Sequence, residues 1–155
     1  MHTIAIIDPG STLTRWLTCT LGQVPRPLGP AGGEAELVIA APGARLPPGN
    51  LRCRVLLLPG ALAHRAGGVQ AGWVVSYGLS RRDTLTLSSL SPRPCLTLQR
   101  ELVTLAGTCL EPQELPLPPC PSPLLLLAWA GGCLLAGEDP AALGKNPCPF
   151  PGKRL

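Results

Sequence analysis

Four short apolar segments, each ending at a turn that contains glycine, most constrain the fold of this 155-residue chain. They are TIAIID (3–8), ELVIAAPG (36–43), CRVLLLPG (53–60) and GWVVSYG (72–78). Short runs of aliphatic and β-branched residues between turn signals are typical of strands that are buried on both faces. Because connectors separate the four runs, they predict a parallel sheet with right-handed crossovers.

The segment GSTLTRWLTCTLGQ (10–23), which follows the first predicted strand, permits two structures. Its apolar residues have helical spacing, with Ser11 or Thr12 as the N-cap and Gly22 as the end. Residues 13–21 also alternate as a strand does, and the threonines favour a strand. We favour the helix and keep the strand as the alternative.

The second half of the chain changes character. DTLTLSSL (83–90) and the segment 95–117 alternate with a period of two, with Ala106-Gly107 as a hairpin turn, which predicts antiparallel strands. An apolar run from 124 to 136 follows; it is shorter than the roughly 20 residues that a bilayer requires, so it predicts a buried helix. We therefore expect a single α/β domain over residues 1–137, a small Rossmann-like parallel sheet extended by antiparallel strands, and a loosely ordered, proline-rich tail over 138–155.

Only 14% of the residues are charged, compared with about a quarter in typical soluble domains. A charge-poor surface predicts a protein partner or self-association, with the 124–136 helix as a candidate face. The net charge of +4 is scattered, without the basic stripe and stacking aromatics of a nucleic-acid binder, so we expect no nucleic acid partner. The seven cysteines lack the close pairing of zinc ligands, and the N-terminus lacks a secretion signal. We expect reduced thiols, a cytoplasmic location, no membrane span, and no metal or cofactor.

The first predicted loop, IAIIDPGSTLTR, resembles the first phosphate loop of the acetate and butyrate kinase group in the actin-like ATPase superfamily. In that group a strand ends in an acidic or amide residue, Pro-Gly-Ser-Thr or a similar sequence follows, and a second hairpin strand begins. The resemblance implies that Asp8, Gly10, Ser11 and Thr12 face nucleotide phosphates through N–H groups and hydroxyls. The chain has no second copy of the loop, and a strand, a turn and a helix cap explain the same residues. We favour this second interpretation.

A longer resemblance covers about residues 55–143. A strand, a short helix, a strand ending in Tyr-Gly, an Asp that opens the next strand, a hairpin and an apolar helix follow one another as in the late part of the Mur ligase central domain. That family binds ATP through a Gly-Lys-Thr/Ser loop. Here the two lysines, Lys145 and Lys153, are not followed by Ser or Thr. The resemblance therefore implies a degenerate domain of this kind, without catalysis.

Three further candidate ligand residues, Ser76, Tyr77 and Asp83, lie at the end of a predicted strand, where open α/β sheets bind ligands. A simple turn, with positive φ at Gly78 and Asp83 closing the loop, explains them as well. Cys53 and His64 could form a catalytic thiol–imidazole pair, but a lone Cys in an apolar strand is usually part of the core. We expect a non-catalytic module that binds a protein or a ligand; the alternative is a small nucleotide- or phosphate-binding enzyme that uses the Asp8–Thr12 turn.

Overall fold

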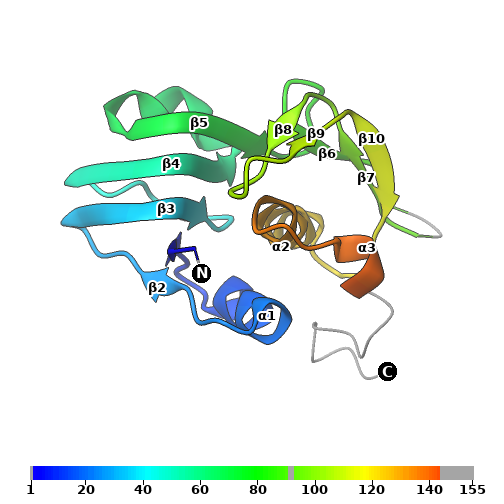
Figure 1. The fold of residues 1–155 in the computed structure, drawn as a ribbon, viewed down its shortest axis with the longest axis horizontal. Coiled ribbons are helices and arrows are strands. Elements are labelled where there is room, and N and C mark those ends of the chain that lie inside the picture. Colours follow the sequence, from blue (N-terminus) through cyan, green and yellow to red (C-terminus); the bar gives the residue numbers. More distant parts are fainter. Residues whose placement is uncertain (1, 91–92, 144–155) are drawn as a thin grey trace.

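A computed structural model describes residues 2–90 and 93–143 and shows a mixed α/β fold (Figure 1). The strands are β1 (Ile4–Ile7), β2 (Arg26–Pro27), β3 (Gly32–Ala40), β4 (Asn50–Pro59), β5 (Gln70–Tyr77), β6 (Leu85–Ser89), β7 (Cys95–Leu98), β8 (Leu102–Val103), β9 (Cys109–Leu110) and β10 (Gln113–Pro116). The helices are α1 (Thr12–Leu21), the 3-10 helix η1 (Gly60–Gly68), α2 (Pro123–Leu135) and α3 (Pro140–Leu143). Within the described residues, eight strands form one sheet in the order β10-β7-β6-β5-β4-β3-β1-β2, and β8 pairs with β9.

The four apolar runs become neighbouring parallel strands, as the sequence predicts: β1 pairs with β3, β3 with β4, and β4 with β5. The second half is mostly antiparallel, because β6 pairs with β7, β7 with β10, and β8 with β9. The β8–β9 pair confirms the predicted hairpin around Ala106-Gly107. One detail differs from the prediction: β6 also pairs with β5, in parallel, through the single position Tyr77–Leu85.

Residues 12–21 form the helix α1, so the helical alternative holds. The hydroxyls of Thr18 and Thr20 donate hydrogen bonds of 2.7 Å to the carbonyls of Thr14 and Trp16, one turn earlier. These bonds satisfy the threonine side chains within the helix. Gly22 ends α1 with a φ of 70°. The hairpin strand that the kinase resemblance implies after the turn is therefore a helix in this chain.

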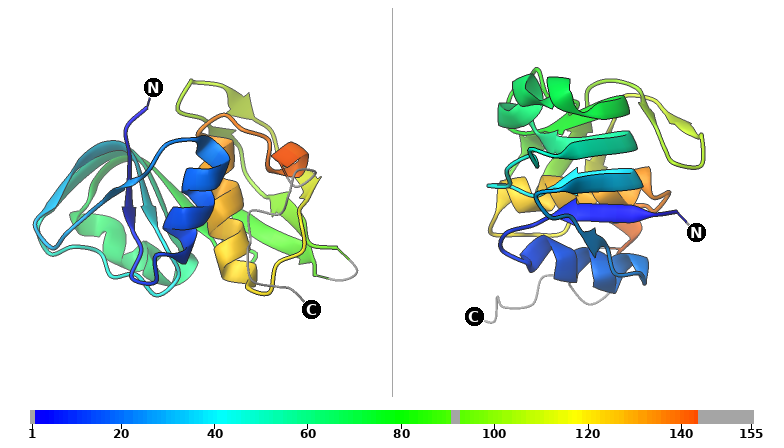
Figure 2. Two further views of the ribbon diagram at one scale, coloured as in Figure 1. Left: turned by 90° about the horizontal axis from the view of Figure 1, so that it is seen from below. Right: turned by 90° about the vertical axis from the view of Figure 1, so that its left-hand side faces the viewer.

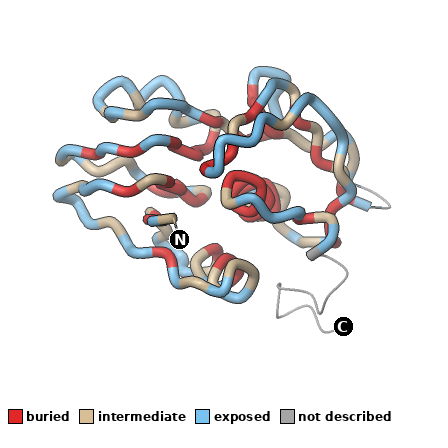
Figure 3. The backbone as a smooth tube through the Cα atoms, in the orientation of Figure 1, coloured by how far each residue is buried: buried red, intermediate tan, exposed pale blue. Residues whose placement is uncertain are grey.

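The helix α2 lies at the centre of the molecule, beside α1 and against the sheet (Figure 2). Every residue from Leu126 to Leu135 is buried, and Figure 3 shows this helix as the most continuously buried segment. Gly132 allows the close approach, because a Cβ there would lie 3.1 Å from Leu17 and Ile39 side-chain carbons. The indole N–H of Trp129 donates a 2.9 Å hydrogen bond to Thr20 of α1.

The 124–136 helix is therefore largely unavailable as the predicted face for self-association, because its apolar side chains from Leu126 to Leu135 are buried within one chain. Leu124, at the first turn of α2, is 36% exposed and is an exception at the end of the helix. No helix in the described part of the chain is long and apolar enough to cross a membrane.

The two faces of the parallel strands have separate apolar clusters. One face packs against α1 and α2, and Ile6, Ile39 and Leu57 are among its buried residues. The opposite face, with Val38 and Leu56, is covered in part by η1. The sheet is thus enclosed between layers on both faces, which explains why its strands are apolar at consecutive positions rather than at alternate ones.

The first residues of the predicted tail are part of the described structure. Glu138 donates its backbone N–H to the carbonyl of Cys133 at 2.8 Å, and Pro140, the first residue of α3, is buried. Residues 138–143 are thus packed on the end of α2. The rest of the predicted tail, residues 144–155, lies outside the described residues.

Candidate ligand-binding crevice

A crevice of about 690 Å³ opens at the carboxyl ends of β1 and its neighbours. The chain leaves β1 through α1 to reach β2 on one side, and then returns to pair β3 on the other side of β1. Open α/β sheets characteristically bind ligands at such a reversal of strand order. The residues that line the crevice are Ile6, Ile7, Asp8, Pro9, Ser11, Thr14, Val24, Pro25, Pro27, Leu28, Gly43 and Arg45.

Asp8, at the end of β1, joins the strand to the start of α1. Its Oδ2 accepts two hydrogen bonds of 2.8 Å, from the backbone N–H and from the hydroxyl of Thr14. Thr14 is the third residue of α1, so the Asp8 carboxylate satisfies a donor of the first helical turn and lies at the positive end of the helix dipole. Asp8 therefore performs the capping role that the sequence assigns to Ser11 or Thr12.

Ser11 occupies the N-cap position, but its side chain makes no capping hydrogen bond. Its backbone is in the left-handed region, with φ of 62° and ψ of −4°, and it is the only non-glycine residue with positive φ in the described part of the chain. Such a conformation costs about 1–3 kcal/mol, and residues of this kind concentrate at functional sites. The strain lies directly on the wall of the crevice.

Arg45 supplies the opposite charge. It follows the β3 strand end, is exposed, and makes no hydrogen bond or ion pair within residues 2–90 and 93–143. A smaller hollow of about 220 Å³ adjoins the crevice and shares Ile7, Leu28 and Arg45 with it. The combined surface is an apolar, proline-rich wall with a carboxylate and a guanidinium at its edge.

Of the four residues predicted at the first turn, Asp8 and Ser11 line the crevice, whereas Gly10 and Thr12 are not among its lining residues. Sequence reasoning missed Thr14, Val24, Leu28 and Arg45. A signal for Arg45 existed, because ARLPPG (44–49) directly follows the predicted strand 36–43. Adjacent parallel strands bring their following loops to the same edge of a sheet.

The second predicted group, Ser76, Tyr77 and Asp83, is held by contacts within the protein. The Tyr77 hydroxyl donates a 2.6 Å hydrogen bond to the carbonyl of Ala40, and the side chain is fully buried. Burial, and secondarily the negative charge of Asp8, raises the pKa of Tyr77. The Ser76 hydroxyl oxygen accepts a 3.2 Å hydrogen bond from the backbone N–H of Thr84. Tyr77 therefore joins β5 to the end of β3.

Asp83 is only 5% exposed, and its Oδ2 accepts a 3.1 Å hydrogen bond from the backbone N–H of Ser80. Two glycines make room for its carboxylate. A Cβ at Gly60 would lie 2.0 Å from Oδ1, and a Cβ at Gly78 would lie 2.4 Å from Oδ2. Gly78 is not among the glycines with positive φ, so the predicted reason for this glycine is wrong: space for Asp83, rather than backbone conformation, requires it.

The loop from Gly78 to Asp83 is also held by hydrogen bonds from Gln99 and Arg100, which follow β7. The Gln99 side-chain amide donates to the carbonyls of Arg81 and Asp83 at 3.1 and 2.8 Å, and the Arg100 guanidinium donates to the carbonyl of Arg82 at 2.6 Å. These bonds satisfy the carbonyls of the turn. The geometry of this group is that of a packed structural turn, as the simpler interpretation of the sequence predicts.

Cys53 and His64 do not form a nucleophile–base pair in the described structure. Burial raises the pKa of the Cys53 thiol to about 11, so it is protonated at neutral pH. His64 is exposed on η1, where its ring nitrogen accepts a 3.4 Å hydrogen bond from Arg65. In the described residues, no group of three or more His, Cys, Asp and Glu side chains could hold a metal ion.

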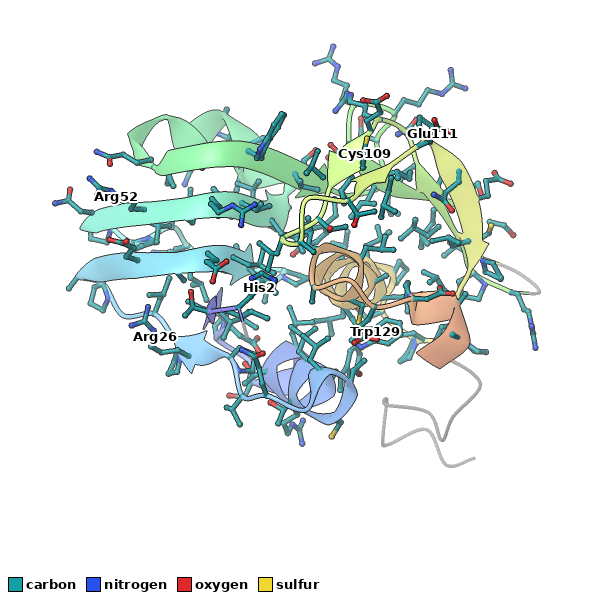
Figure 4. All side chains as sticks on the ribbon, in the orientation of Figure 1. His2, Arg26, Arg52, Cys109, Glu111 and Trp129 are labelled. Carbon is teal, nitrogen blue, oxygen red and sulfur yellow. The ribbon has the colours of Figure 1, made fainter. Side chains whose placement is uncertain are left out.

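A separate ion-pair cluster joins the residues that precede β1 to the middle of β3 and β4. His2 Nδ1 lies 2.8 Å from Glu36 Oε2, and Arg54 lies 3.6 Å from the same oxygen (Figure 4 labels His2). The hydrogen bond from His2, followed by one from the backbone of Thr3, lowers the pKa of Glu36. Arg54 also donates to the carbonyl of Leu105. This cluster fixes the N-terminus and the β8–β9 turn to the sheet.

The crevice is thus a candidate binding site: a hollow at the reversal of strand order with one carboxylate, one guanidinium, an apolar wall and a strained backbone. Comparison of the chain with protein-family models, curated proteins and solved structures gives no match.

Proposed function

We propose that this protein is a non-catalytic module that binds a small ligand in the crevice at the carboxyl ends of β1 and β3. The observation that carries the proposal is that a carboxylate, Asp8, and a guanidinium, Arg45, both line one apolar hollow of about 690 Å³. That volume is in the usual range for small-molecule sites, which combine an apolar lining with a few polar groups. The left-handed backbone of Ser11 beside the hollow supports a binding role.

The two charges define the ligand chemistry. Thr14 uses Oδ2 of Asp8, and no hydrogen bond within the described residues involves Oδ1. Oδ1 therefore suits an amine or hydroxyl donor, and Arg45 suits a carboxylate or another anionic group. Val24, Leu28 and the prolines suit an apolar body between them. A zwitterionic molecule with an apolar side chain matches all three features.

A nucleotide or phosphate ligand is the rival proposal. In its favour, the N-terminus of the ten-residue helix α1 lies at the crevice, and helix N-termini bind phosphates. Against it, the Asp8 carboxylate already occupies that helix end, and a phosphate would meet it as a like charge. We therefore place the zwitterionic ligand first.

Amide chemical-shift titration separates the two proposals. The probe is leucyl-leucine, a zwitterionic dipeptide with apolar side chains. We expect it to shift the amide resonances of the turn from Asp8 to Thr14 saturably, and we expect Arg45→Ala to abolish this shift. Arg65→Ala, at an exposed arginine on η1, is the matched control and should bind normally. Saturable binding of ATP, with or without magnesium, that is lost in Asp8→Ala would replace our proposal with the nucleotide-binding one.

We also propose that the fold is Rossmann-like and that the chain contains a degenerate Mur-ligase-like domain. From β4 to α2 the elements are a strand, a short helix, a strand ending in Tyr77-Gly78, the strand β6, a hairpin and an apolar helix. This order supports a Rossmann-like architecture and a degenerate Mur-ligase-like domain. We also propose a cytoplasmic protein with reduced thiols; the six cysteines in the described residues form no disulfide with one another.

A further inference from the structure

Most of β5 has only one neighbouring strand. On one side β5 pairs with β4 from Gln70 to Tyr77, but on the other side it pairs with β6 only at Tyr77. Figures 1 and 2 show β5 as the outermost strand of the parallel part, from which β6 continues away. In the described part of the chain, no strand covers the other edge of residues 70–76. The helix η1 lies over the sheet face, where Leu62 and Val69 pack against the second apolar cluster.

The open edge is apolar and lacks the charged residues and prolines that usually protect an edge strand from pairing. Trp73 is 61% exposed and Val74 is 47% exposed, and Figure 3 shows most of β5 as exposed. Gly78, two residues beyond Ser76, donates its N–H to Leu85 of β6. Because strand backbone groups alternate in direction, the N–H and C=O of Val74 face the same, open side. Between Gln70 and Ser76 there is no charge and no proline, which are the usual guards of such an edge.

Arginines precede and follow β5 in the sequence. Residues 37–82, which include β4, η1 and β5, contain six arginines and no acidic residue. Arg65 is exposed on η1, which precedes β5, and Arg81 and Arg82 are exposed in the loop that follows β5. The positive charges are therefore found before and after an uncharged strand.

We propose that the open edge of β5 binds an extended segment of another protein, which has an uncharged, β-branched centre and acidic residues on both sides. The segment adds as a further strand next to β5, through the backbone groups of Val74, and its apolar side chains contact Trp73 and Val74. Its acidic residues pair with the arginines before and after β5. A second copy of this chain fits less well, because two-fold antiparallel pairing brings the Arg81-Arg82 end of one β5 near the Arg65 end of the other.

The test uses a synthetic probe, an acetylated and amidated peptide with a Val-Thr-Val-Thr-Val centre between two Glu-Asp pairs. We expect saturable binding to the full chain by fluorescence anisotropy, together with a change in Trp73 fluorescence that Trp73→Phe removes. N-methylation of alternate peptide residues should weaken binding at least about tenfold, because it removes strand hydrogen bonds without changing the side chains. The same centre between two Lys pairs should not bind.

Variants of the protein complete the test. Val74→Pro removes the N–H that faces the open edge and leaves the pairing with β4, so it should also weaken binding at least about tenfold. The double variant R81E/R82E should weaken the acidic peptide and strengthen the basic one. Arg45→Ala, in the crevice, should have no effect, which separates this inference from the proposed function. Equal binding of N-methylated and unmodified peptides, no binding of the acidic peptide, or a dimer that Val74→Pro dissociates would overturn the proposal.

Discussion

Two acidic turns at the carboxyl edge of the sheet share one sequence pattern and have different structural roles. Asp8 follows β1 and Asp83 follows β5, and each has glycine nearby in the chain. Asp83 is 5% exposed and fills the space that Gly60 and Gly78 leave. Asp8 is half-buried, with one oxygen on α1 and the crevice beside it. An acidic residue at a strand end is therefore a candidate for ligand binding only where its surroundings leave room for a ligand.

The two turns also differ in backbone conformation. No residue of the turn at Asp83 has a positive φ, and Gln99 and Arg100 donate hydrogen bonds to its carbonyls. The turn at Asp8 contains the left-handed Ser11, whose side chain makes no cap hydrogen bond. Strain beside a crevice supports the proposed binding role of the first turn, whereas close packing around a buried acid indicates that the second turn contributes to stability.

The largest expected effect is that of Gly60→Ala. A Cβ at this position would lie 2.0 Å from Oδ1 of Asp83, so the buried carboxylate has to move. We expect a loss of about 3 kcal/mol in the free energy of unfolding, as for other overpacked sites, measured by urea denaturation.

Gly10→Ala is the matched control at the Asp8 turn, because nothing lies within 4 Å of a Cβ there. The double variant G60A/D83A should lose less than the sum of the two single variants, since removal of the carboxylate relieves the clash. If the losses of the two single variants simply add in the double variant, Gly60 and Asp83 do not share the space. The contrast between the Asp83 turn and the Asp8 turn would then lose its physical basis.

Asp83→Ala on its own should cost about 2 kcal/mol, because the backbone N–H of Ser80 loses its acceptor, the buried carboxylate of Asp83. Ligand binding in the crevice should not change. Loss of leucyl-leucine binding in a variant that remains folded, by the same chemical-shift titration, would mean that the Asp83 turn belongs to the binding site after all.

Asp8→Ala should cost less, about 1 kcal/mol, since it removes a helix cap at a half-buried position. Asp8→Asn keeps a side-chain oxygen for the Thr14 N–H and should recover part of that stability. Both variants should bind the zwitterionic probe more weakly, because each removes the charge. Normal binding by Asp8→Asn would show that Asp8 serves only as a cap.

The parallel core could be predicted from the sequence because its strands are buried on both faces and end at Pro-Gly or Gly, so each signal is local. β2 could not be predicted, because two residues in a proline-rich connector form a strand only by pairing with β1. The helix α1 was ambiguous for a physical reason: threonine hydroxyls that bond to the preceding turn satisfy a residue type that otherwise favours strands.

The candidate site could be predicted only where it is continuous in sequence. Asp8 and Ser11 were found because they belong to one turn. Arg45 and Leu28 reach the crevice because β3 and β2 lie on either side of β1, and this order is a property of the whole sheet. The space that encloses the Asp83 carboxylate could not be predicted from the sequence either, because it depends on Gly60, 23 positions earlier in the chain.

The smallest expected effect concerns the strain at Ser11. Glycine adopts a φ of 62° without the clash that a Cβ causes, so Ser11→Gly should raise the free energy of unfolding by about 0.5–1 kcal/mol. No residue of the Asp83 loop has a left-handed backbone, so Ser80→Gly should not stabilise the protein and serves as the control. If the strain holds the turn in its binding geometry, Ser11→Gly should also weaken the leucyl-leucine probe in the chemical-shift titration. A variant that gains stability and keeps full affinity would show that the strain is a by-product of the tight connection between β1 and α1, and that the crevice owes its shape to the sheet order alone.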